Sequence, residues 1–197
     1  MIAFIIATFV LAAIPGPALL SIVGAGSAFG FKGGLPYTLG ALLGANIVII
    51  LSIIGFASIL MAEPNLKMVL SMVSLGYLVY IAVQVAASNR IVDNNEEKSR
   101  LGVINGVIIQ LVNPKAYAVG IALFSGFPLA INNMLSEVIV KLILINSIFI
   151  PAYFLWLFFG EILHAQLSET KNNKTVKVSL ALLMMLSVVM STISIFS

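Results

Sequence analysis

The chain has 197 residues, of which 61% are hydrophobic and only 9% are charged, and its mean hydropathy is +1.16. Soluble domains have about half apolar and about a quarter charged residues, so this composition excludes a water-soluble protein. The net charge of +3 comes from basic residues scattered singly at the ends of apolar runs, which is typical of membrane topology and not of nucleic-acid binding.

Six apolar runs are each long enough to cross a hydrocarbon core about 30 Å thick. They fall at residues 2–30, 35–62, 66–87, 102–130, 135–163 and 176–196. Unbroken runs predict helices, because a transmembrane barrel needs alternating polar and apolar positions. No Lys or Arg precedes the first run, which continues past residue 20, so we expect a span and not a cleaved signal peptide. The whole chain, 1–197, is therefore expected to be one all-α integral membrane domain.

Proline interrupts the first and fourth runs near their middles. The interruptions read Ile14-Pro15-Gly16-Pro17-Ala18 and Val112-Asn113-Pro114-Lys115-Ala116. Proline removes a backbone donor and clashes with the preceding turn, so each site should break or sharply kink its helix. Freed backbone groups are tolerated at membrane depth only where they face protein or a water-filled cavity, so the breaks are expected to point inward.

The two broken spans are three helices apart, which divides the chain into halves at residues 1–87 and 102–197, joined by the polar loop 88–101. An odd number of spans per half turns the second half upside down. Interrupted spans at corresponding positions of inverted halves point to the binding site of a transporter. The sequence thus predicts six transmembrane helices in a 3+3 inverted repeat, with helices one and four broken at the site.

Basic residues are concentrated on one side of this arrangement. Seven lie in the loops after spans one, three and five, and two, Lys67 and Lys141, lie on the other side. Cytoplasmic loops collect Lys and Arg, which puts both termini outside.

The candidate substrate-binding residues surround the breaks and are Pro15, Gly16, Pro17, Ala18, Asn46, Asn113, Pro114, Lys115 and Ala116. A charge near the centre of a span marks function by default, so we expect Lys115 to pair with a substrate carboxylate. The alternative is that it caps carbonyls freed at the Asn113-Pro114 break. The half-helices after the breaks offer amides to an anionic group. Asn46 and Asn146 either line the cavity or link helices, and Gln110 is similarly ambiguous.

The charges also indicate a substrate class. No carboxylate lies in the middle of a span, so a cationic substrate such as lysine would meet only Lys115 and be repelled. We therefore expect a neutral or anionic substrate. Glu137 and Lys141, four residues apart near a helix start, are expected to form a surface ion pair.

Several motifs together carry a family resemblance. They are Pro15-Gly16-Pro17, then Gly33, Gly40 and Gly44, then Gly76-Tyr77-Leu78 with Tyr80, and finally Gly106, Leu111 and residues 113–116. In this order and spacing the chain resembles the LysE/RhtB family of bacterial amino-acid exporters. The resemblance implies a secondary exporter of amino acids or related small metabolites in the bacterial cytoplasmic (inner) membrane, driven by proton exchange and dimeric. Ile14 and Ala18 stand where the family commonly has Thr and Asn, which removes two polar side chains beside the break.

Two other classes of function compete with this interpretation. A channel or a non-transporting membrane subunit stays open as an alternative, although neither requires paired broken helices. An intramembrane enzyme is not expected, because the chain has no cysteine and His164 is its lone histidine. No cofactor, metal or nucleic-acid partner is expected; the expected partners are a small substrate, the lipid bilayer and a coupling proton.

Overall fold

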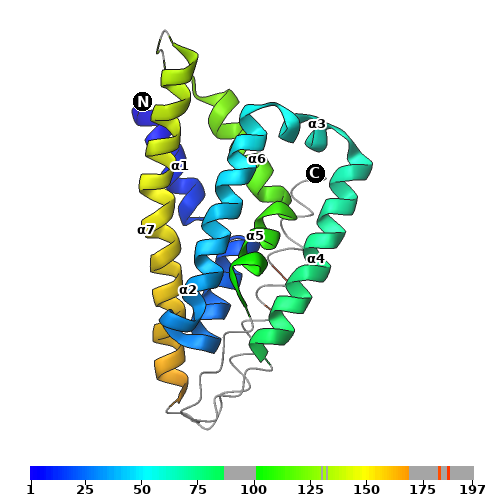
Figure 1. Cartoon of the computed structure of the whole chain (residues 1–197), viewed down its shortest axis with the longest axis vertical. Helices are drawn as coiled ribbons and strands as arrows, with labels where there is room; N and C mark the ends of the chain where they lie inside the picture. Colours follow the sequence, from blue (N-terminus) through cyan, green and yellow to red (C-terminus); the bar gives the residue numbers. More distant parts are fainter. Residues whose placement is uncertain (87–100, 130, 132, 169–181, 183–185, 187–197) are drawn as a thin grey trace.

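The structure of the chain is a computed structural model that describes residues 1–86, 101–129, 131, 133–168, 182 and 186. Seven helices are present in these residues and no strand: α1 (Ile2–Ala13), α2 (Pro17–Ile53), α3 (Phe56–Ala62), α4 (Pro64–Ala86), α5 (Val103–Leu111), α6 (Pro114–Gly126) and α7 (Met134–Ser168). In Figure 1, α7 runs along one side and α4 along the other, with α2, α5 and α6 between them. Nearly all of the expected sixth span, 176–196, and of the polar loop 88–101 lies outside the described residues.

Three helices are long and apolar enough to cross a membrane, namely Pro17–Ile53, Pro64–Val85 and Met134–Leu163, and α5 with α6 makes a fourth if the bent pair is one span. Many of their large apolar side chains point outward, including Leu155, which is 67% exposed. Such side chains suit lipid, because lipid tails are as apolar as leucine. The all-α membrane fold is confirmed for the described chain, and the count of six spans stays a prediction.

The long helix α2 folds back on itself at Gly30, where φ is 70° and ψ is 179°. A Cβ added at Gly34 would lie 3.3 Å from the backbone of Ala25, whereas residues nine apart in a straight helix are separated by about 14 Å. The Tyr37 hydroxyl also donates to Ser21 Oγ over 2.7 Å, between the two arms. The predicted boundary between the first two spans therefore falls at this reversal.

Glycines bring the helices around the breaks close together. A Cβ at Gly40 would meet the carbonyl of Val103, and one at Gly106 would meet the α2 backbone, so the second arm of α2 lies directly against α5. Gly26 and Gly160 bring the first arm of α2 equally close to α7. These small residues pack helices within the chain.

Candidate functional site

The first break lies between α1 and α2. α1 ends at Ala13, Ile14 and Gly16 have extended backbones, and Pro17 takes the first position of α2. Proline suits that position, because the first amides of a helix have no partner within the helix. The break leaves the last carbonyls of α1 and the first amides of α2 available to other groups.

The second break, between α5 and α6, bends the pair by 68°. α5 ends at Leu111, and Pro114 again takes the first position of the following helix. The side-chain oxygen of Asn113 caps α6 by accepting a hydrogen bond of 3.1 Å from the backbone nitrogen of Lys115. Both predicted breaks are therefore confirmed at the residues where proline chemistry placed them.

The two breaks meet through the side chain of Lys115. Its Nζ donates to the carbonyl oxygen of Ile14 over 2.9 Å, across 101 positions of sequence. Its stem lies over Gly16, where an added Cβ would be 2.9 Å from Lys115 Cδ and 3.1 Å from Nζ. Because Gly16 is extended, with φ −129°, the space taken by the lysine and not the backbone geometry explains a glycine there. The lysine thus caps a freed carbonyl, but one at the opposite break.

A small cavity lies between the breaks, walled by parts of α1, α2, α5, α6 and α7. Its polar lining consists of Gln110, Asn113, Lys115 and Tyr153, and the rest is apolar, including Leu11, Ile49, Leu123 and Phe149. The cavity has a volume of about 60 Å³, and since a water needs about 10–15 Å³ by this measure, only a few waters would fill it.

The structure brings most of the candidate residues to this cavity. Among its lining residues are Gly16, Ala18, Asn113, Lys115 and Ala116. Pro15, Pro17 and Pro114 form the breaks beside it and are not among the lining residues. Asn46 is not among them either.

Asn46 forms a reciprocal pair with Asn146 of α7. The amide nitrogen of each donates to the oxygen of the other, over 3.0 and 2.9 Å. Each nitrogen also donates, over 2.9 Å, to the carbonyl four residues earlier, that of Leu42 or Leu142. Of the two roles left open by the sequence, the pair has the geometry of the link between helices.

Tyr153 lines the cavity, and sequence patterns did not identify it. Gln110 Nε2 donates to its hydroxyl, and the two residues are 2% and 6% exposed. Phe149 stacks against Tyr153 with ring centres 6.1 Å apart. A buried glutamine in an apolar span needs a partner, which is the signal that pointed to some polar contact here.

Within the described residues, no three His, Cys, Asp or Glu side chains gather as a metal site would require. Ser21, Ser52 and Ser71 each donate to a backbone carbonyl of their own helix.

Comparison with known protein families gives a match. The family model described as LysE type translocator matches residues 9–194, nearly the whole chain. Searches of curated proteins and of solved structures found no match.

Proposed function

The chain belongs to the LysE type translocator family, and on that premise we propose that it exports neutral amino acids by binding them between its two helix breaks. Membership of a translocator family, together with the apolar helices, makes the chain a multi-pass membrane transport protein and not an enzyme. The proposal adds the substrate, the site and the coupling.

One observation carries the proposal: Lys115 Nζ and the Ile14 carbonyl oxygen lie 2.9 Å apart at the cavity. A zwitterionic amino acid has a carboxylate that can accept a hydrogen bond from the Lys115 ammonium, and an ammonium that can donate one to the Ile14 carbonyl. Inserting the substrate between them exchanges one charge-assisted hydrogen bond for two. Ala18 and Leu19, which carry the first amides of α2, also line the cavity and add positive partial charge that suits a carboxylate.

The walls favour a neutral side chain. No acidic residue is among those that line the cavity in the described chain, so a lysine or arginine side chain would find no counter-charge there. Leu11, Ile49, Leu123 and Phe149 present an apolar surface instead. The proposed substrates are therefore small or aliphatic amino acids.

The cavity of about 60 Å³ must widen to admit an amino acid. The contacts that hold it narrow are those of Lys115 with Ile14 and Gly16, and a bound carboxylate would compete for the same ammonium. A ligand shifts an equilibrium by its differential affinity for the two states, so substrate would favour a state in which the breaks have separated.

The proposal includes an inverted 3+3 repeat in the bacterial inner membrane, with both termini outside and proton exchange as the driving force. The repeat is supported by Asn46 and Asn146, which lie 100 residues apart in the sequence and make equivalent hydrogen bonds, one to each other and one to the carbonyl four residues earlier. Pro15 and Pro114 show nearly the same offset at the breaks. Proton coupling and a homodimer follow from the family resemblance and remain predictions.

Exchange in proteoliposomes tests the proposal. Labelled L-leucine is exchanged against internal L-alanine, L-threonine, L-leucine, L-glutamate or L-lysine, and we expect efficient exchange with the neutral three and little with L-glutamate or L-lysine. A lost hydrogen bond to a charged group costs about 1.5–3 kcal/mol, so Lys115→Gln should raise KM about 10- to 150-fold. The exposed Lys32→Gln is the matched control and should leave KM unchanged.

Two results would contradict the site and one would contradict the mechanism. Wild-type KM in a normally expressed Lys115→Gln variant, or L-lysine exchanging as well as L-leucine, would remove the proposed role of the ammonium. Downhill L-leucine flux that drives no countermovement of protons would indicate a channel.

A further inference from the structure

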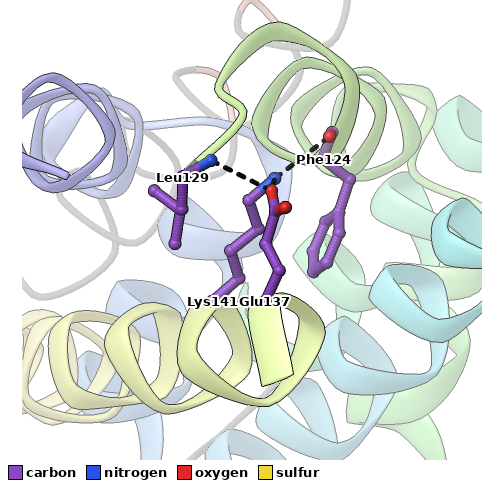
Figure 2. Close-up of polar contacts among 4 residues, drawn as sticks. All are labelled: Phe124, Leu129, Glu137 and Lys141. Carbon is purple, nitrogen blue, oxygen red and sulfur yellow. Dashed lines mark hydrogen bonds and ion pairs between the residues drawn. The ribbon is translucent and has the colours of Figure 1, made fainter. Parts of the chain in front are cut away.

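An ion pair within α7, with a buried lysine and a partly exposed glutamate, contacts the end of α6 that lies far from its break (Figure 2). Lys141 Nζ lies 2.8 Å from Glu137 Oε1, and the side chains are 2% and 22% exposed. The prediction of a surface ion pair is therefore wrong for Lys141, whose side chain is buried. Lysines near the ends of membrane helices ordinarily reach toward the interface, so the contacts that turn Lys141 inward have to be strong.

Each member of the pair also binds another segment (Figure 2). Lys141 Nζ donates to the Phe124 carbonyl in the last turn of α6 over 3.2 Å, and Glu137 Oε1 accepts from the Leu129 backbone nitrogen over 3.1 Å. The ammonium lies 5.8 Å from the ring centre of Phe4 in α1 and 5.3 Å from that of Phe124, within the range of about 6 Å for cation–π attraction. The pair thus holds α1, α6 and the segment after α6 on α7.

Among the described residues, the elements packed against the pair have no other charged side chain at this end. α1 has no charged side chain, and α6 has only Lys115, nine residues before Phe124. At 1.5 Å per residue this is about 14 Å along the helix. α6 therefore carries Lys115 at one end and contacts the ion pair, through the Phe124 carbonyl, at the other.

An apolar plug fills the space between the pair and the cavity. Its buried members are Phe4, Ile49, Leu123, Leu129 and Ile145. Ile49 and Leu123 also line the cavity, whereas Phe4 and Leu129 contact the ion pair. A substrate moving from the cavity toward this end would have to part α1, α6 and α7 at the plug.

We propose that the Glu137–Lys141 pair locks a gate on the substrate path, closing the cavity toward the end where α6 finishes and α7 begins. The inference rests on the proposed transport function, because a path is needed for a gate to close. In the closed state the pair holds α6 and α1 over the plug. In the open state Lys141 leaves the Phe124 carbonyl and Glu137 leaves the Leu129 amide. The distribution of basic residues puts this end outside, so the gate is the outward one.

Thiol labelling tests the lock, because the chain has no cysteine to give a background signal. Leu123→Cys reports on the plug, and Leu78→Cys in α4 is the matched control; both positions are 0% exposed. Each reporter is placed in the wild-type chain and in the double variant Glu137→Gln/Lys141→Met. The double variant is preferred because removing Glu137 alone would leave the buried Lys141 without its counter-charge, whereas replacing both members is commonly tolerated.

The full-length protein in proteoliposomes is labelled with a charged methanethiosulfonate. Minor conformations are typically populated at about 0.1–10%, so releasing the lock should raise the population of the open state and speed labelling of Leu123→Cys about tenfold, while Leu78→Cys stays unchanged. Unchanged labelling of Leu123→Cys would overturn the proposal, and equal acceleration at both reporters would overturn it too, by showing that the pair only stabilises the fold. Labelling needs no substrate, so its failure is distinct from a failure of amino-acid exchange.

Discussion

The substitution Gly16→Ala is expected to displace Lys115, the proposed substrate-binding residue, without removing it. The new methyl group would lie 2.9 Å from Lys115 Cδ and 3.1 Å from Nζ, against an optimum near 3.5–4.0 Å for carbon contacts, so the stem must retreat by about 0.6–1 Å. A retreat of that size takes Nζ out of hydrogen-bond range of the Ile14 carbonyl. Because the backbone at position 16 is extended and the clash is with a flexible side chain, the free energy of unfolding should fall by about 1 kcal/mol or less, including the poorer helix cap.

The expected cost is to binding. Misplacing one charged hydrogen-bond donor by this distance should weaken substrate binding by about 1.5 kcal/mol, which corresponds to about a tenfold rise in KM. This value is at the lower end for such bonds because Lys115 is partly exposed. L-Leucine exchange in proteoliposomes measures KM, and thermal unfolding in detergent measures stability. Gly76→Ala is the control, since a Cβ there meets nothing within 4 Å. If the Gly16→Ala variant folds normally and its KM is unchanged, the position of Lys115 does not depend on its packing over Gly16.

Three further outcomes follow from the packing. Gly40→Ala should prevent stable accumulation of the protein, because its Cβ would overlap backbone atoms of α5 that cannot move cheaply. Such overpacking costs about 1–3 kcal/mol or more. A normal yield on size-exclusion chromatography together with normal thermal unfolding would contradict this. Asn146→Leu should lower the free energy of unfolding by about 0.6–2 kcal/mol, because the Asn46 amide loses its partner. The double variant Asn46→Leu/Asn146→Leu should recover part of this loss. Equal losses in both variants on thermal unfolding would argue against the reciprocal pair. Tyr153→Phe should keep the fold but raise KM for L-leucine about 5- to 10-fold, since the buried Gln110 amide loses its partner at the cavity wall, and an unchanged KM would show that the tyrosine does not shape the site.

Local chemistry explains which features the sequence could predict. The breaks were predictable because proline acts on its own helix, so Pro15, Pro17 and Pro114 fix where α1 and α5 end whatever packs around them. The boundary between the first two spans was predictable from the length of the apolar runs, although the runs did not reveal a reversal as sharp as the one at Gly30.

Contacts between distant segments could not be predicted in the same way. The bond from Lys115 to Ile14 depends on how the two halves pack, because either break offers freed carbonyls within reach of a lysine. Lys141 looked like a surface residue because its sequence neighbourhood marks only a helix start, and its burial comes from α1 and α6 folding over it. Tyr153 had no local sign of its role, since its partner is a glutamine on another helix.

The central claim is that Lys115 binds the substrate carboxylate between the two breaks. The direct measurement is inhibition of labelled L-leucine exchange by unlabelled L-leucine and by L-leucinamide, which lacks the carboxylate, in the wild-type protein and in Lys115→Gln. We predict that the wild-type protein prefers L-leucine over L-leucinamide by about 10- to 150-fold, the worth of one charge-assisted hydrogen bond, and that Lys115→Gln loses most of this preference. An equal preference in both proteins would contradict the claim.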